Sequence, residues 1–218
     1  MLSNQKHALW EAFLVAAVIF ILGIFLGIYF ENSRTENINS FYLKSEIAMS
    51  DGLALNLVTN LNQSMCPALI NASLVFADRV FDEAVLLENY EKTQKINSKT
   101  AALHTKYDLL RTFLWVNAMQ IKEKCPRSDV STVVYLYDYN EKDLDKQAEQ
   151  NVWSKILIDL KEKEGKNVLL IPIARDLNIS SLDAILGSYS IKDSPAIILP
   201  NKEIIYKPIS VEEILKKI

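Results

Sequence analysis

Glycine, cysteine and histidine are all scarce in this chain. Its 218 residues include 5 Gly, 2 Cys and 2 His. So little glycine predicts few tight turns and favours long helices. His7 and His104 are far apart in the sequence, and we expect each to be a solvated surface residue rather than a metal ligand. The sequence predicts no metal site and no cofactor.

A surplus of positive charge is also missing. The chain has 24 Lys and Arg against 27 Asp and Glu, a net charge of −3 and a pI near 5.5. Nucleic-acid-binding proteins usually show a basic surface, so we expect no nucleic-acid partner. The length allows one or two domains.

One long apolar run lies near the N-terminus. Residues Ala12 to Phe30 are uncharged and mostly apolar, and Glu11 and Glu31 close the run. At about 1.5 Å per residue, such a helix nearly spans a hydrocarbon core of about 30 Å. Cleavage of a signal peptide requires small residues, whereas this run ends Ile28-Tyr29-Phe30. We therefore favour an uncleaved membrane anchor.

Two glycines inside the anchor follow the spacing Gly23-x-x-x-Gly27. This spacing lets two membrane helices pack closely and indicates a possible homodimer. Glycine is also common in membrane helices that do not pair, and the sequence leaves both interpretations open. Basic residues are nearly balanced on the two sides of the anchor, so charge alone does not orient it.

Three further helices are expected between the anchor and Pro126. Apolar residues recur at helical spacing from Asn37 to about Leu61, with Gly52 as a weak point. Ser64 is a candidate cap for a second helix, which runs to about Tyr90. Its predicted buried stripe is Cys66, Ile70, Ala77, Phe81, Ala84 and Leu87. The third helix carries a heptad-like seam of Leu103, Tyr107, Leu110, Leu114, Asn117 and Ile121.

The two cysteines, Cys66 and Cys125, lie at opposite ends of these last two helices. The midpoint between them falls in the polar connection, so an antiparallel hairpin brings them together. We predict a structural disulfide, with two buried reduced thiols as the alternative. A disulfide implies an oxidising compartment, which favours a cytoplasmic N-terminus and an extracytoplasmic C-terminal domain.

The segment after Pro126 alternates strands and helices. Gly165 ends the long helix, Pro172 places its strand at a sheet edge, and Ser210 to Glu213 forms a capping box. The long helix shows an i, i+4 stripe of Leu144, Ala148, Val152, Ile156 and Leu160, which we expect to be buried. The predicted elements are strands at 131–138, 168–174, 196–199 and 203–206, and helices from Leu144, Ser181 and Ser210.

This order, βαβαββα, resembles the thioredoxin fold over about Ser131 to Ile218. The stretch from Tyr189 to Leu199 is similar to the family's helix end, loop, cis-proline and third strand. The resemblance implies that Pro195 is the cis-proline and that the backbone of Ser194 faces the site. The layout of anchor, hairpin and tail is also similar to small membrane-anchored archaeal proteins.

Redox-active members of that family carry Cys-x-x-Cys at the start of the first long helix. The corresponding positions here are Glu141 and Leu144, which cannot exchange a disulfide. The resemblance therefore implies a redox-inactive, non-enzymatic member. Its inherited peptide groove would be formed by Tyr139, Asn140, Glu141, Leu144, Ser194 and Pro195.

Other candidate features are weaker. Asp138, Glu141, Asp143 and Asp145 form an acidic cluster, which we interpret as a solvated helix start rather than a cation site. Tyr135, Tyr137 and Tyr139 alternate along one strand face, where we expect packing against a helix, with Tyr139 the most exposed. Asn62, Asn71 and Asn178 each begin an N-glycosylation triplet.

These observations predict an α+β chain with three parts: an anchor (1–31), a helical stalk (32–126) and an α/β thioredoxin-like domain (127–218). We expect a single-pass membrane protein that binds an unidentified protein or peptide partner at the membrane surface. One alternative is a thiol–disulfide oxidoreductase using Cys66 and Cys125. Another is a membrane oligomer in which the tail is only a spacer.

Overall fold

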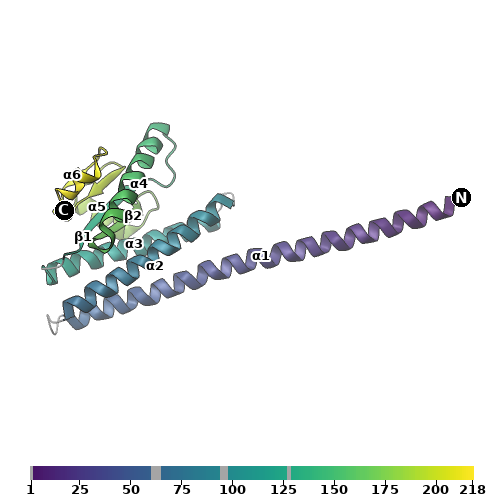
Figure 1. The fold of residues 1–218 in the computed structure, drawn as a ribbon, viewed down its shortest axis with the longest axis horizontal. Helices are drawn as coiled ribbons and strands as arrows, with labels where there is room; N and C mark the ends of the chain where they lie inside the picture. The colour runs from purple at the N-terminus through teal and green to yellow at the C-terminus, as the bar shows by residue number, and fades with distance from the viewer. Residues whose placement is uncertain (1, 60–64, 94–97, 127–128) are drawn as a thin grey trace. The chain divides into compact units, whose positions relative to one another are not determined.

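The computed structural model describes residues 2–59, 65–93, 98–126 and 129–218 (Figure 1). The chain divides into two compact units, Met1–Phe41 and Tyr42–Ile218. The predicted division into anchor, stalk and thioredoxin-like domain stays a prediction.

The first unit consists of the N-terminal part of α1 (Leu2–Thr59). Its segment Trp10–Phe30 has a mean hydropathy of 2.8 and is 0% buried, and it is the one span in the described residues long and apolar enough to cross a membrane. We expected a separate helix to start near Asn37, but α1 continues without a break through Gly52. A glycine inside a helix costs only about 1 kcal/mol, too little to end it.

The second unit contains the hairpin of α2 (Cys66–Thr93) and α3 (Ser98–Lys124). The predicted seam of α3 is confirmed, because all of its residues from Tyr107 onwards are buried and Leu103 is half-buried. The proposed cap at Ser64 and the midpoint of the connection lie outside the described residues.

The predicted stripe of α2 is right only in part: Cys66 and Ile70 pack against the buried residues of the hairpin, and the side chains of Ala84 and Leu87 lie outside the described residues. Phe81 is 63% exposed, and the buried positions are instead Leu69, Ser73, Phe76 and Val80. This face contains a serine, which is why its pattern was missed. Ser73 is satisfied there by the Asn117 side chain, whose Nδ2 donates to its Oγ at 2.9 Å. A buried polar pair of this kind fixes how the two helices align.

The sheet has the order β2-β1-β3-β4. Its strands are β1 (Ser131–Tyr137), β2 (Val168–Ala174), β3 (Ala196–Ile198) and β4 (Ile204–Ile205). The pair β1–β2 is parallel, whereas β1–β3 and β3–β4 are antiparallel. The predicted order of elements is confirmed. The peptide bond between Ser194 and Pro195 is cis, as expected.

The outer edge of β2 is closed by specific groups, as its predicted edge position requires. Backbone groups of alternate residues point to the same side of a strand. The Lys161 Nζ donates to the Val168 carbonyl at 2.8 Å, and the Ala174 N–H donates to Asp108 Oδ1 at 3.2 Å. Pro172 lies between them and has no N–H to expose. Covering an edge in this way prevents pairing with other strands.

Three helices follow the strands: α4 (Leu144–Glu164), α5 (Ser180–Ser188) and α6 (Val211–Leu215), with a short 3-10 turn, η2 (Gly165–Asn167), after α4. Asp143 caps the start of α4 by accepting from two backbone N–H groups. Gly165 ends that helix with φ 55°, a conformation that favours glycine. The predicted capping box of Ser210 and Glu213 is confirmed.

The predicted buried stripe of α4 is wrong in its first half. Leu144 is 77% exposed, and Val152 is also exposed. The buried face is Trp153, Leu157 and Leu160, which pack with Val133, Tyr135, Val168, Ile197, Leu199 and Ile214 in one apolar core. Trp153 and Leu157, which are not in the predicted stripe, thus form the buried face of α4 together with Leu160, which is.

The opposite face of the sheet is covered by α3 and α5. A shallow crevice brings residues of α2 and α3 against Thr132 and Leu169, which lie on that face. Trp115 of α3 packs on Tyr189 at the end of α5, with ring centroids 5.6 Å apart.

Candidate functional site

The carboxyl ends of β1 and β2 meet the loop that precedes β3. Asp138 directly follows β1, while Arg175 and Asp176 directly follow β2. Ligands of open α/β sheets commonly bind outside the carboxyl ends of the strands. A ligand-binding site is therefore expected at this end of the sheet, and the six predicted groove residues all lie around it.

Asp138 joins the three segments that meet there. The Ser194 Oγ donates a short hydrogen bond to Asp138 Oδ2, and the Arg175 Nε lies 3.1 Å from Asp138 Oδ1. The Gln150 side chain of α4 also accepts from the Asp138 N–H at 2.7 Å. Ser194 is only 3% exposed, and its hydroxyl proton goes to a carboxylate that is also held by an arginine. Ser194 is therefore a structural donor and not an activated nucleophile.

Asp176 fixes the turn between β1 and α4. Its carboxylate accepts from the Tyr139 N–H at 2.7 Å, from the Asn140 N–H at 2.8 Å and from the Asn140 side-chain amide at 3.0 Å. These bonds satisfy the backbone of the turn from a neighbouring strand. No local pattern predicts this role, because Asp176 and Asn140 are 36 residues apart.

The structure separates the predicted groove residues into two kinds. Asn140 and Leu144 have exposed side chains, and Tyr139 and Glu141 are half-buried. Ser194 and Pro195 are buried. The Asp138–Ser194 bond brings the turn and the loop together. Leu144, which we expected in the core, is instead an exposed apolar side chain beside that junction.

His104 is buried, not solvated as the sequence suggested. It is 7% exposed, and its ring stacks on Tyr139 with centroids 3.8 Å apart. Its Nε2 lies 3.1 Å from the Tyr137 hydroxyl and 3.3 Å from Asp108 Oδ2. A residue of α3 thus supports the aromatic ring at the rim of the candidate groove. Tyr139 is correspondingly less exposed than predicted.

Asp108 and Arg111 form a buried ion pair behind this stack. The Arg111 Nη1 donates to Asp108 Oδ1 at 3.2 Å, and the guanidinium lies 3.8 Å above the Tyr107 ring. Its Nη2 also makes a short hydrogen bond to the Tyr107 hydroxyl. Burial raises the pKa of Asp108, and Arg111 and His104 lower it only in part. The sequence did not predict this pair, because charged residues in a helix are usually expected to face solvent.

The strand tyrosines pack as expected. Tyr135 lies in the apolar core, 6.5 Å from the Trp153 ring, and its hydroxyl donates to the Gln150 carbonyl at 3.2 Å. Burial raises the pKa of the Tyr135 and Tyr137 hydroxyls above the usual range. Both tyrosines therefore stay neutral at physiological pH, which suits packing and not acid–base chemistry.

Two acidic residues near the start of α4, Glu141 and Asp143, accept hydrogen bonds from nearby backbone N–H groups. Glu141 Oε1 accepts from the Lys142 and Asp143 N–H groups at 2.8 and 2.9 Å, and Asp143 caps α4. Across the described ranges, no three His, Cys, Asp or Glu side chains converge in a way that would hold a metal ion.

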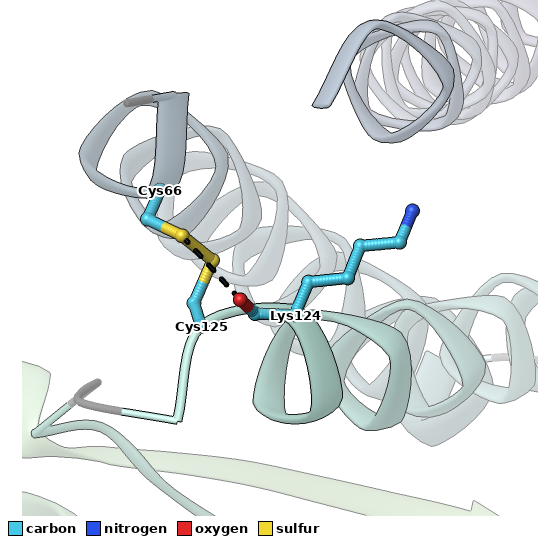
Figure 2. The surroundings of a disulfide bond; sticks show 3 residues. All are labelled: Cys66, Lys124 and Cys125. Carbon is cyan, nitrogen blue, oxygen red and sulfur yellow. Dashed lines mark hydrogen bonds between the residues drawn. A yellow bond between two sulfur atoms is a disulfide. The ribbon is translucent and has the colours of Figure 1, made fainter. Parts of the chain in front are cut away.

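The predicted disulfide between Cys66 and Cys125 is present (Figure 2). It joins the start of α2 to the end of α3 and packs on Leu69 and Ile121. Cys125 is 4% exposed. The Cys66 sulfur also lies 4.0 Å from the Lys124 carbonyl oxygen; since a disulfide sulfur carries no hydrogen, this is a packing contact.

In comparisons with known proteins, no protein-family model, no curated protein and no solved structure matches the chain.

Proposed function

We propose that this chain is a single-pass membrane protein that displays a redox-inactive, thioredoxin-like domain outside the cytoplasm. The domain holds an extended peptide segment of a partner protein at the membrane surface. The binding groove lies between the β1–α4 turn and the Ser194–Pro195 loop.

The membrane part of the proposal is supported by the Trp10–Phe30 segment. None of its residues is buried in the protein, and it contains no charged residue after Glu11. A helix of this composition is stable in lipid and unfavourable in water. The Cys66–Cys125 disulfide supports the extracytoplasmic placement of the second unit, because such bonds persist in oxidising compartments.

The thioredoxin-like part is supported by topology. The order β2-β1-β3-β4, with β1 and β2 parallel and helices on both faces, agrees with the resemblance found in the sequence. Glu141 and Leu144 stand where that family's redox cysteines would be. Neither residue exchanges electrons, which favours binding over catalysis.

The exposure of Leu144 is the observation that best supports the proposed peptide-binding groove. It is 77% exposed at the first residue of α4, next to a turn that Asp176 and Asp138 hold in place. A large apolar side chain on a rigid, otherwise polar rim gains most from contact with another apolar side chain. Asn140 is exposed beside it and supplies a polar group for the backbone of a bound peptide.

Site-specific photocrosslinking in membranes tests this groove. A photoreactive residue replaces Leu144 in the full chain, and the same residue replaces Ile158 in a matched protein. Ile158 is exposed on the same helix but lies about four turns away. We expect a discrete adduct from position 144 that position 158 does not give, and Asn140→Ala should weaken it. Identical adducts from both positions, or none from 144, would overturn the proposal.

The oxidoreductase alternative is less well supported. Cys125 is almost fully buried in a small apolar cluster, whereas exchanging cysteines need access and a stabilised thiolate. A ready reduction of the Cys66–Cys125 bond by a mild thiol in the folded protein would favour this alternative.

The oligomer alternative rests on Gly23 and Gly27. Among the described residues, nothing lies within 4 Å of a Cβ placed at either position, so no described neighbour packs against either glycine. Both remain available for close contact with a second anchor. Crosslinking of full-length protein in membranes should report this contact as a homodimer that Gly23→Ile with Gly27→Ile abolishes.

A further inference from the structure

Asn178 lies in the loop between β2 and α5, in the triplet Asn178-Ile179-Ser180. This is the acceptor pattern for N-linked oligosaccharide. The side chains of Asn178 and Ser180 are exposed, whereas Ile179 is buried. Asn178 has φ 55°, a conformation that asparagine tolerates well. The folded loop therefore presents both the acceptor amide and the hydroxyl of the triplet to solvent.

The triplet that begins at Asn71 is a natural comparison. Asn71 is exposed, but it lies inside α2, where the backbone is fully helical. The hydroxyl of its third residue, Ser73, is buried and accepts a hydrogen bond from Asn117. A transferase reaches this triplet only if α2 unwinds close to the Cys66–Cys125 disulfide. The third triplet, at Asn62, lies outside the described residues.

We propose that Asn178 is an N-glycosylation site of the folded domain and that Asn71 is not. The donor is an oligosaccharide carried on a polyprenyl phosphate lipid, and a membrane transferase catalyses the reaction. A bond forms between Asn178 Nδ2 and the anomeric carbon of the sugar. The bond from that carbon to the phosphate oxygen breaks, its electron pair leaves with the lipid phosphate, and the amide loses one proton to solvent. The inference rests on the extracytoplasmic placement proposed above.

Peptide mass spectrometry of the full chain, purified from the membranes of cells that make it, tests the inference. We expect the peptide that contains Asn178 to carry the added mass of an oligosaccharide and to release sugar fragment ions. The peptide that contains Asn71 should carry no such mass. Three variants sharpen the assignment: Ser180→Ala should remove the glycan, Ser180→Thr should retain it, and Asn71→Gln should leave it unchanged.

These variants do not threaten the fold. Ser180 is exposed, and no side chain caps the start of α5, so loss of its hydroxyl removes no hydrogen bond from the helix end. Asn178→Asp provides a second variant that keeps the backbone conformation favourable and removes the acceptor nitrogen.

The state of the cysteines in the same sample separates the two possible failures. An unmodified Asn178 in a protein whose Cys66 and Cys125 are oxidised overturns the glycosylation site and leaves the placement standing. Free thiols together with an unmodified Asn178 overturn both. Equal modification of Asn71 and Asn178 overturns the selectivity that the fold predicts.

Discussion

The helices on the two sides of the sheet contact it through different kinds of interaction. On the side of α4 and α6, contact is almost wholly apolar and centres on Trp153 and Leu160, both fully buried. On the side of α3, the contact at the β2 edge runs through charged and aromatic groups: Asp108 binds the Ala174 N–H and the Arg111 guanidinium. Asp108 and Arg111 both belong to α3, so the ion pair lies within the helix, and the hydrogen bond from the Ala174 N–H to Asp108 is the contact that links this helix to the edge of β2.

Helix α3 also contacts the candidate groove. His104 belongs to the same helix as Asp108 and stacks on Tyr139 at the groove rim. The charged and aromatic residues of α3 thus contact the candidate site, whereas Trp153 and Leu160 pack in the apolar core beneath α4.

Asp108→Ala should have the largest effect. It leaves the buried Arg111 without its carboxylate and the Ala174 N–H without an acceptor, so we expect the free energy of unfolding to fall by about 5 kcal/mol. Urea unfolding of the full chain in detergent micelles, followed by tryptophan fluorescence, measures this. The double variant Asp108→Leu with Arg111→Met should recover most of the loss, because no buried charge then remains. A neutral Asp108→Ala would contradict the role of the ion pair.

Removing the disulfide should cost slightly less. Cys66 and Cys125 are 59 residues apart, and the chain-entropy model gives about 4 kcal/mol for a loop of this size. Cys66→Ala with Cys125→Ala should lower the urea midpoint, and strong chemical reduction of the wild type should lower it to a similar degree. An unchanged midpoint after complete reduction would show that the bond does not constrain the hairpin.

Leu160→Ala tests the apolar side. It opens a cavity in the core beneath α4 and should lower the free energy of unfolding by about 3 kcal/mol. Val152→Ala on the exposed face of the same helix is the matched control, with an expected change within about 0.5 kcal/mol. A larger loss at Val152 than at Leu160 would reverse the assignment of the buried face.

Asp193→Asn should have the smallest effect. The Lys146 Nζ lies 2.8 Å from Asp193 Oδ1 and links α4 to the loop before Pro195. Both side chains are more than a third exposed, so we expect a loss of less than about 1 kcal/mol at neutral pH.

The pH dependence of that loss has a definite sign. The hydrogen bond from Lys146 lowers the pKa of Asp193. Its contribution is therefore present above the ordinary aspartate pKa and is lost as pH falls through the lowered value. Unfolding curves of wild type and Asp193→Asn should converge in acid. A difference that persists there would assign the effect to something other than this charge.

Local patterns predicted the elements of the second unit well. Gly165, Pro172 and Ser210 each act through their own backbone or neighbouring residues, and each lies where its chemistry indicated. The predicted disulfide also followed from the positions of only two cysteines and the symmetry of a hairpin.

The sequence-based predictions fail where the burial of a residue depends on residues that are distant in the sequence. The buried face of α4 depends on how Trp153 meets the sheet, which an i, i+4 count does not reveal. The burial of Ser73 depends on Asn117, 44 residues away, and Asp108 meets Ala174 across 66 residues. A charged residue looks solvated in sequence until its partner is known. The groove residues were predicted only from the family resemblance.

A disulfide-locked binding domain outside the cytoplasm requires that Cys66 and Cys125 are oxidised in the cell, and alkylation of thiols in intact cells measures this state. Mass spectrometry then reports whether Cys66 and Cys125 react before or only after reduction. We expect both cysteines to be protected until a reductant is added. Labelling of both cysteines without reduction would contradict the lock and, with it, the extracytoplasmic placement.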